Sequence, residues 1–503
     1  MRSKKALYNI ISNLVLQIVI IIYGFVVPKI IIDHFGSDVN GLIASITQFL
    51  AYISLLESGF GPVVKATLYK PIAKKDNNAI AGILKTSEKF FRRIALIFIL
   101  YIMILCFVFP LIARADFDAI FTISLVVIIG ISTFAEYYFG MTYKIFLQAE
   151  QKTYVVSVIQ IATYIVSAIA VVVMALLGCN VLLIKLITGL VFIIRPLAQN
   201  IYVKRKYNIQ LDSATNNYPI KQKWDGLAQH IASVIHGNTD VAVLTIFTTL
   251  AEVSVYSVYF LVVAGIKKIV QSLVNGLDAS FGDMIAKEEN DNLKKKFSTF
   301  ELLFFMIITS VFACTFVLIT PFVQVYTKGV TDADYIRPIF GYLLVASEFI
   351  WALRAPYSSL TLAAGHFKQT RKGAWVEAIV NIVLSVILVF NFGLVGVTIG
   401  TIVAMLIRTV EFVRHANKYI LKRNVWASVG KIVIAIIATI ITVVIVHFIN
   451  LMMPNGYMTW ILNAFIVFLI AAIVSFALFF MCYKKEFMMA MKRVKKIIKR
   501  KKK

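Results

Sequence analysis

Long apolar runs, interrupted by short polar or charged clusters, make up most of the sequence. A helix that spans a membrane needs about 20 mostly apolar residues, and clusters of Gly, Pro, Asn, Asp or charged residues mark where such runs end. The pattern predicts fourteen spans, at residues 6–32, 39–69, 90–113, 118–146, 154–177, 180–203, 223–249, 252–286, 298–327, 335–363, 372–391, 394–416, 428–450 and 457–482. We therefore expect an all-α polytopic membrane protein.

Basic residues gather in alternate connections between these spans. Lysine and arginine are frequent at residues 70–93, 204–223, 287–296, 366–372 and 418–423. They are rare in the other connections, at residues 33–38, 116–118, 178–180, 391–393 and 454–457; the main exceptions are Lys328 and Arg337, which lie beside Asp332 and Asp334. Because cytoplasmic loops carry the excess of Lys and Arg, and because the number of spans is even, we predict that both termini are cytoplasmic.

Composition excludes a soluble protein and a nucleic-acid partner. Apolar residues are 60% of the chain and charged residues 15%, whereas soluble domains have about 45–50% and 25%. The 51 Lys and Arg against 25 Asp and Glu give a net charge of +26. Such an excess can indicate nucleic-acid binding, but the apolar runs leave no room for a groove-reading domain.

Much of the positive charge lies in the tail, residues 483–503. Within it, Phe487, Met491, Val494 and Ile498 recur at steps of three or four, which predicts a helix with one apolar face on the membrane surface. We expect this cytoplasmic tail to bind anionic lipid. The alternative is a solvated basic tail that only fixes topology.

Two similar stretches indicate an internal repeat. LQAEQKT at residues 147–153 and LAAGHFK at 362–368 are each followed by two spans that end in an arginine, Arg195 or Arg408. Six spans separate the copies, and an even offset makes the two halves parallel. The predicted domains are an N-lobe of six helices at 1–203, a cytoplasmic linker at 204–222, a C-lobe of six helices at 223–416, two extra spans at 417–482 and the basic tail at 483–503.

Several cations fall inside the predicted spans, where a charge should face a cavity or a partner. Lys267, Gln271 and Asn275 recur on one helical face, with Lys268 beside them. Together with Arg354 and Lys65, these residues are the candidates for binding a substrate. The alternatives are that Lys267 pairs with an acid only for packing, and that Arg354 and Lys65 reach the headgroups at the membrane surface.

Acids inside the spans are candidates for coupling to a proton or sodium gradient. Asp240 would be a coupling carboxylate with His236 as its partner, or else a structural hydrogen-bond acceptor. Glu57 precedes a break at Gly59, Gly61 and Pro62, where freed carbonyls could hold a cation; the alternative is a simple kink. Glu136 and Glu348 occupy nearly matching places in the two halves and would line a cleft.

Catalytic motifs give little reason to expect an enzyme. The sequence has no P-loop and hence no ATP site, and we predict neither a cofactor nor a metal. The D-x-D pairs Asp116–Asp118 and Asp332–Asp334 match the metal-holding pattern of some membrane glycosyltransferases, but they lie in loops of a few residues.

The span pattern and five segments together resemble the polysaccharide flippases of the multidrug/oligosaccharidyl-lipid/polysaccharide exporter superfamily. The segments are PKIIIDHFGSDVNGL (28–42), YISLLESGFGPVVKATLYKPIAKKDNNAI (52–80), GNTDVAVLTIF (237–247), EVSVYSVY (252–259) and AAGHFK (363–368). The resemblance covers residues 6–482. It implies a V-shaped transporter of a bacterial cell membrane that moves an undecaprenyl-pyrophosphate-linked oligosaccharide to the outer leaflet by alternating access.

In this interpretation the intramembrane cations would meet the anionic headgroup, and the acids would couple transport to an ion gradient. A glycan polymerase and glycosyltransferases are expected partners. The alternatives are a cation-coupled multidrug antiporter, which should prefer acids in its cleft, a membrane glycosyltransferase, and an assembly partner that transports nothing.

Overall fold

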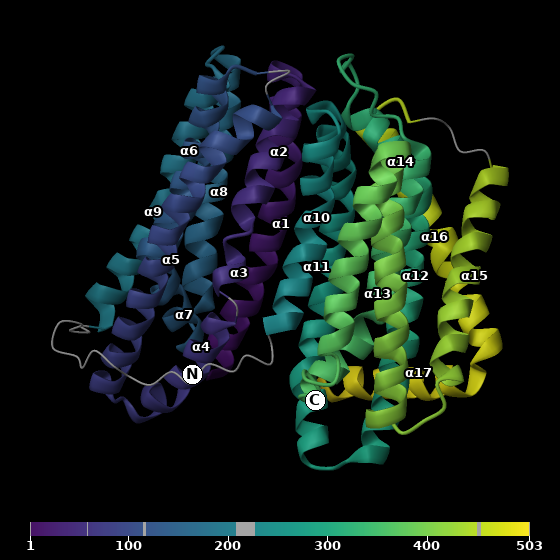
Figure 1. Cartoon of the computed structure of the whole chain (residues 1–503). Helices are drawn as coiled ribbons and strands as arrows, with labels where there is room; N and C mark the ends of the chain where they lie inside the picture. Colours follow the sequence, from purple (N-terminus) through teal and green to yellow (C-terminus); the bar gives the residue numbers. More distant parts are fainter. Residues whose placement is uncertain (1, 58, 114–116, 208–226, 450–453, 502–503) are drawn as a thin grey trace. The chain divides into compact units, whose positions relative to one another are not determined.

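The computed structural model describes residues 2–57, 59–113, 117–207, 227–449 and 454–501; within these, the side chains of 2–6, 227–229, 236, 275–280 and 493–501 are outside the description. Every regular element in the described residues is a helix (Figure 1). Twelve of these helices are long and apolar enough to cross a membrane. The predicted all-α polytopic class is confirmed.

The described residues form two compact units. One comprises Met1–Ser257 with Val330–Ala333, and the other Val258–Gly329 with Asp334–Lys503. The predicted lobe boundaries stay a prediction, and most of the predicted linker at 204–222 lies outside the described residues.

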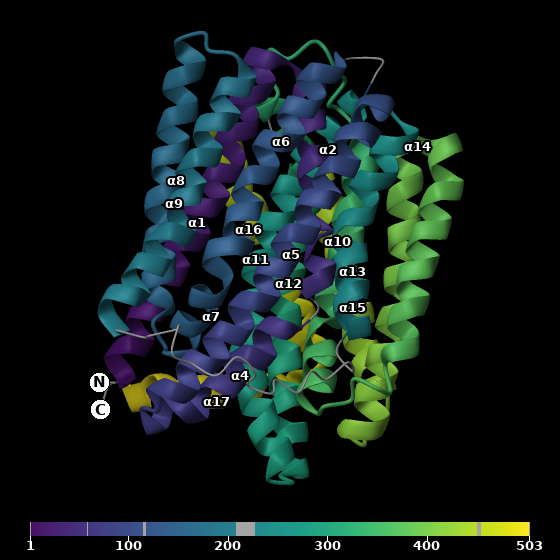
Figure 2. The ribbon, with the colours of Figure 1, turned by 60° about the vertical axis from the view of Figure 1, so that its left-hand side comes forward.

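The first unit is a bundle in which both consecutive and sequence-distant helices pack against each other. Helix α1 runs along α8, α8 packs against α9, and α6 lies between α5 and α9 (Figures 1 and 2). The uncharged residues Asn9 and Asn13 on α1 bond to the amide of Tyr154 (2.8 Å) and the hydroxyl of Ser157 (2.8 Å) on α8. Its helices are α1 (Arg2–Phe35), α2 (Ser37–Ala51), α3 (Ser54–Glu57), α4 (Phe60–Lys74), α5 (Asn77–Ile112), α6 (Ala119–Ala135), α7 (Met141–Ala149), α8 (Thr153–Leu176), α9 (Val181–Tyr207), α10 (Leu227–Phe247) and the first residues of α11 (Leu250–Ala286).

The predicted span at 39–69 is broken into α2, α3 and α4. Helix α4 begins after Gly59, whose φ of 77° lies in the left-handed region that favours glycine. The sequence-predicted break is therefore confirmed. The segment predicted to span at 223–249 is helical as α10, but α10 is not among the twelve helices that are apolar enough to span.

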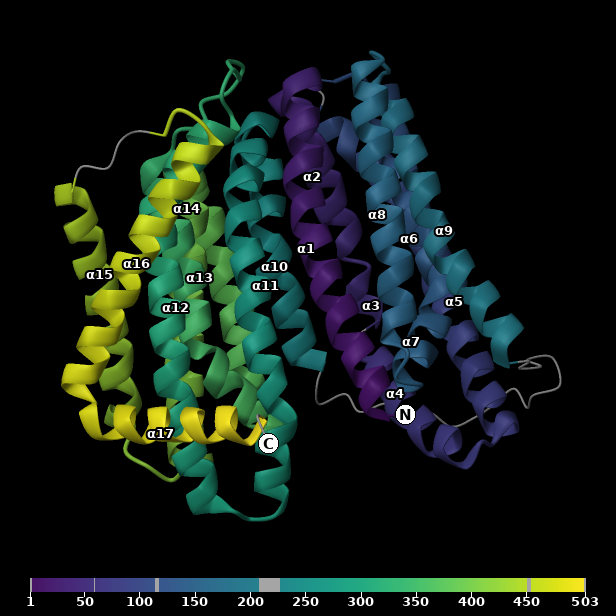
Figure 3. The ribbon, with the colours of Figure 1, turned by 180° about the vertical axis from the view of Figure 1, so that it is seen from behind.

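The second unit is built around α12. This helix packs against α13, α15, α16 and α17, and α17 runs across one end of the bundle at a steep angle to α12 and α16 (Figure 3). Besides the rest of α11, its helices are α12 (Asn290–Tyr326), α13 (Pro338–Ala363), α14 (Arg371–His415), the π-helical turn η3 (Ala416–Ile420), α15 (Trp426–Ile449), α16 (Tyr457–Cys482) and α17 (Lys484–Lys501).

Helix α14 contains two predicted spans, 372–391 and 394–416. Its backbone leaves helical geometry at Gly393, with φ 52° and ψ −127°, and the two arms on either side pack antiparallel. The Asn381 amide donates to Thr401 Oγ1 (2.9 Å), and Ser385 Oγ donates to the Val397 carbonyl (3.2 Å). Gly393 is therefore the turn between two spans, as the sequence predicted.

The two repeat segments form the same turn. In each, one residue takes a left-handed conformation, Gln151 with φ 57° and Gly365 with φ 73°. Its amide bonds to the carbonyl three residues back (3.2 and 3.0 Å), and the next amide bonds five residues back (2.8 and 3.2 Å). This pair of backbone hydrogen bonds closes the C-terminus of a helix. The turns match with a shift of one residue from the sequence alignment.

Candidate functional site

Lys267 and Glu348, predicted separately as a substrate cation and a coupling acid, form an ion pair in the second unit. Lys267 Nζ on α11 lies 3.0 Å from Glu348 Oε2 and donates to Oε1 at 3.1 Å on α13. The same ammonium lies 4.8 Å from the centre of the Trp351 ring. The Lys267 side chain is 26% exposed and that of Glu348 is 5% exposed. The Lys267 side chain is thus partly exposed, whereas the Glu348 side chain is buried.

Other predicted ligands extend this group along α11. Lys268 and Gln271 are exposed next to Lys267, so three polar side chains are accessible within about one turn of the helix. The side chain of Asn275 lies outside the described ones. This part of α11 therefore presents two cations, of which Lys267 is paired with Glu348 and Lys268 is exposed.

Arg354 lies in a buried ionic cluster between α13 and the two arms of α14. Its Nη1 donates to Glu377 Oε1 at 2.5 Å, and Arg408 Nε lies 3.4 Å from Glu377 Oε2. Arg408 also pairs with Glu411 and donates to the Thr370 carbonyl at 2.9 Å. Arg354 is only 8% exposed and Arg408 1%. The cluster holds α13 to α14, and contact of Arg354 with a substrate stays a prediction.

In the first unit, Glu57 and Glu136 share one polar group. Lys144 Nζ lies 2.7 Å from Glu136 Oε1, and Tyr137 donates to Glu57 Oε2 at 3.4 Å. Lys144 and His230 are close enough to act on the charge of Glu57. Glu136 starts the π-helical turn η1 (Glu136–Gly140), a type of helix distortion that is frequent at functional sites. Lys65, another predicted ligand, is partly buried on α4.

Asp240 on α10 is 5% exposed and accepts a hydrogen bond from the Tyr256 hydroxyl at 3.0 Å. Similar polar contacts join α2 to α10 and α11, since Asn40 donates to Ser254 at 2.8 Å and Ser45 bonds to Thr245 at 2.7 Å. These contacts fit the structural alternative for Asp240. The side chain of His236 lies outside the described ones, and ion coupling at Asp240 stays a prediction.

The three described D-x-D aspartates bond to helix starts or to an arginine. Asp332 accepts from the Ser37 amide (2.6 Å) and hydroxyl (2.7 Å) and so caps α2. Asp334 lies 3.1 Å from Arg337, and the Asp118 carboxylate accepts from the Ile120 amide at the start of α6. Asp116 is outside the described residues, within which no group of His, Cys, Asp and Glu is arranged to hold a metal ion.

Four charged residues that form ion pairs in the structure were recognisable in the sequence but were not among the predicted site residues. Lys144, Glu377, Glu301 and Lys431 all lie within predicted spans, so each was subject to the rule that an intramembrane charge needs a partner. All four lie near the ends of their spans, where long side chains can reach the headgroups.

Comparison with known proteins gives similarity at the level of structure. No family model matches the sequence, and none of the curated proteins compared with it matches significantly. The lipid II flippase MurJ, in an inward closed conformation, has a TM-score of 0.66 and 13% identity over 95% of this chain and 99% of MurJ. The chain therefore shares the all-helical fold of MurJ.

Two multidrug transporters of the MATE family share this fold. An inward-facing MATE transporter of the MOP superfamily has a TM-score of 0.61 and 12% identity, over 81% of this chain and 98% of its own. The transporter DinF-BH, in a ligand-bound complex, has a TM-score of 0.59 and 14% identity, over 82% and 95%. MurJ therefore matches a larger share of this chain than either MATE protein.

Proposed function

We propose that this protein is a transporter of the MOP superfamily that flips undecaprenyl-pyrophosphate-linked oligosaccharide from the inner to the outer leaflet of a bacterial cell membrane. Alternating access, driven by a proton or sodium gradient, moves the headgroup while the lipid tail stays in the bilayer. The fold shared with MurJ supports the flippase class. The glycan delivered outside would serve surface polysaccharide synthesis, with a polymerase and glycosyltransferases as partners.

The observation that carries the proposal is the Lys267–Glu348 pair, with its exposed cation and buried acid. A pyrophosphate headgroup is anionic and accepts strong hydrogen bonds from ammonium groups. It can replace Glu348 as the counter-ion of Lys267, with Lys268 close by on the same surface. Because a buried carboxylate without a counter-ion is costly, Glu348 then takes up a proton. Binding of the substrate to Lys267 is then coupled to protonation of Glu348.

The second candidate, multidrug antiport, draws support from the MATE fold but less from the charges. A transporter of cationic drugs needs an acid that can accept a cation. The predicted acids already have partners among the described residues: Glu348 contacts Lys267, Glu136 contacts Lys144, Glu57 contacts Tyr137 and Asp240 contacts Tyr256. The mixed charges favour an anionic substrate.

The test is transbilayer movement of a fluorescent polyprenyl-pyrophosphate oligosaccharide in proteoliposomes, with and without a pH gradient. We expect Lys267→Gln to slow movement by about 10- to 100-fold, as loss of one charged hydrogen bond predicts. Glu348→Gln should keep downhill movement but lose its stimulation by the gradient. Lys287→Gln, which changes an exposed lysine between α11 and α12, is the matched control. If the wild type moves no lipid-linked sugar but expels a cationic dye, the antiporter is the correct function.

A further inference from the structure

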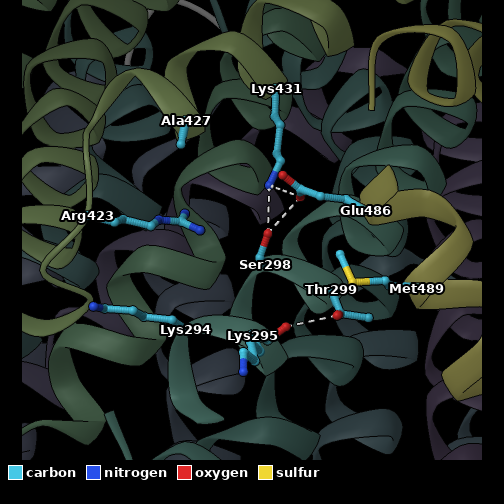
Figure 4. Close-up of a pocket in the computed structure, with 9 residues that line it drawn as sticks. All are labelled: Lys294, Lys295, Ser298, Thr299, Arg423, Ala427, Lys431, Glu486 and Met489. Atoms are coloured by element: carbon cyan, nitrogen blue, oxygen red, sulfur yellow. Dashed lines mark hydrogen bonds and ion pairs between the residues drawn. The ribbon is translucent and has the colours of Figure 1, made fainter. Parts of the chain in front are cut away.

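A basic cavity of about 360 Å³ lies in the second unit, away from Lys267, where α12, α15 and α17 meet (Figure 4). Its basic side chains come from the start of α12 and from the start of α15 with the turn before it, and its acid comes from α17. The polar residues that line it are Lys294, Lys295, Ser298, Thr299, Arg423, Lys431 and Glu486. By the charge rule these helix ends are the cytoplasmic ones.

Glu301 holds the two inner cations of the cavity in place. Its side chain has no exposed surface, and it pairs with Lys431 Nζ at 2.9 Å and Arg423 Nη2 at 2.7 Å. Tyr357 (2.5 Å) and Ser428 (2.8 Å) donate to the same carboxylate. The side chain of Lys431 is 1% exposed and that of Arg423 14%. Because these cations are already ordered, a ligand loses less entropy when it binds them.

Arg423 keeps part of its guanidinium for a ligand. Its Nε donates to Asn417 at 2.6 Å, and its Nη2 donates to Glu301 and to Ser428. None of its contacts with described residues uses Nη1. In Figure 4 the guanidinium points toward the cavity, between Lys431 and Lys294. An arginine that is fixed on one side presents its remaining N–H groups in a geometry that suits a phosphate.

The rim of the cavity adds two lysines and one acid. Lys295 is exposed, and Lys294 is partly buried without an ion-pair partner among the described residues. Glu486 accepts from Lys431 (2.8 Å) and from Ser298 (2.7 Å). Even with Glu301 beneath the cavity, the bases outnumber the acids, so the cavity attracts an anion.

Helix α17 places this cavity at the level of the lipid headgroups. Phe487 is buried against Phe476 and Phe480, with ring centres 4.8 and 5.3 Å apart. On the same helix Met488 and Met489 are 47% and 53% exposed, and Met489 lines the cavity. Exposed methionines beside lysines on a helix that crosses the bundle end are typical of a helix lying in the membrane interface.

We propose that this cavity binds the phosphate group of an anionic phospholipid, with Lys294, Lys295 and Arg423 as its ligands. Basic pockets between membrane helices on the cytoplasmic side are known to bind anionic headgroups. Inorganic phosphate has the same chemistry, but the exposed methionines favour a ligand with acyl chains. The proposal concerns a site separate from Lys267 and does not depend on which substrate is transported.

The test measures binding of phosphatidylglycerol and of phosphatidylcholine to the full-length protein in a neutral detergent, by native mass spectrometry. The cavity variant is Lys294→Gln with Lys295→Gln. Its matched control is Lys287→Gln with Lys296→Gln, which removes the same charge from the same helical hairpin outside the cavity lining. We expect the cavity variant to bind phosphatidylglycerol about 30-fold more weakly, because it loses two lysines that each contribute the usual energy of a lysine near anionic lipid. The control should differ by about twofold or less.

Two results would overturn the proposal: equal loss in the cavity variant and the control, or no preference of the wild type for phosphatidylglycerol over phosphatidylcholine. A parallel measurement adds inorganic phosphate alone and follows thermal unfolding. If phosphate stabilises the wild type but not the cavity variant, while phosphatidylglycerol has no effect, the phosphate site stands and its ligand is a soluble anion. Both lysines lie outside the Glu301 contacts, so the unfolding temperature without ligand also checks that the variants fold.

Discussion

At the residue scale, most of the buried charges among the described residues lie in groups of opposite sign. Glu301 has four donors around one carboxylate, and Glu377 lies between Arg354 and Arg408. The reason is the low dielectric of the interior, in which an ion without a counter-ion costs several kcal/mol. Each group also joins different helices, so the same contacts that compensate charge fix the packing of α12 to α15 and of α13 to α14.

Removing the charge of Glu301 should destabilise the protein strongly. Glu301→Gln leaves Lys431 and Arg423 buried with one acid fewer, and breaking a buried pair in this way costs about 3–5 kcal/mol. Glu486→Gln is the control, because its carboxylate is 36% exposed and partly exposed pairs contribute only about 1 kcal/mol or less. Thermal unfolding in detergent, followed by tryptophan fluorescence, measures both. Equal shifts for the two variants would contradict this assignment.

The sequence identified some site residues but not their pairing. Lys267 and Glu348 were each recognisable as intramembrane charges, but they are 81 residues apart, and which residue of α13 faces Lys267 depends on side-chain packing. Glu57 and Glu136 were recognisable too, whereas their neighbour Lys144, near the end of its span, was not singled out. A hydropathy pattern locates a charge along a helix, but it cannot say which neighbouring helix supplies the partner.

At the element scale, apolar run length predicted the helices well and their interruptions only in part. The break at Gly59 and the turn at Gly393 were visible, because glycine and polar residues interrupt an apolar run there. The end of α2 at Ala51 was not visible, because apolar residues continue past it. Helix α17, which crosses the end of the bundle, could be predicted from the regular spacing of its apolar residues. Its contact with α16 through Phe487 could not be predicted from the sequence.

The packing of α2 on the start of α11 depends on a residue with no side chain. A Cβ atom on Gly41 would lie 1.8 Å from the backbone oxygen of Leu250, so Gly41→Ala must push the two helices apart. Overpacking of this kind costs about 1–3 kcal/mol. Gly265→Ala on α11 is the control, because a Cβ there meets nothing within 4 Å, and alanine is the better helix former. We expect a lower unfolding temperature only for Gly41→Ala; an unchanged temperature would exclude this tight contact.

At the scale of the whole molecule, α10 decides the topology. Twelve of the described helices are long and apolar enough to cross a membrane, and α14 contributes two spans because it turns at Gly393. Helix α10, which carries Asp240 and other polar residues, is not among the twelve. Hydropathy alone therefore leaves an odd number of crossings, whereas the alternation of basic loops requires an even one. The fourteen predicted spans hold only if α10 crosses the membrane.

Reporter fusions test this directly in a bacterial host. We expect a fluorescent protein fused after Tyr207 to be bright, and alkaline phosphatase fused there to be inactive, because basic loops are cytoplasmic. Fused after Thr248, at the other end of α10, the two reporters should give the opposite result. A fluorescent protein at the C-terminus should again be bright. The same signal after Tyr207 and Thr248 would show that α10 does not cross.

The burial of Glu301 also has a consequence for how the chain is made. Lys431 lies 130 residues after Glu301, so at the usual rate of roughly 5–20 residues per second its counter-ion leaves the ribosome roughly 6–26 seconds later. During that interval α12 is already made, and the Glu301 carboxylate lacks the Lys431 and Arg423 partners that it has in the folded protein. A polypeptide that ends before Arg423 would lack both partners throughout, so we expect it to pack α12 less stably than the full chain.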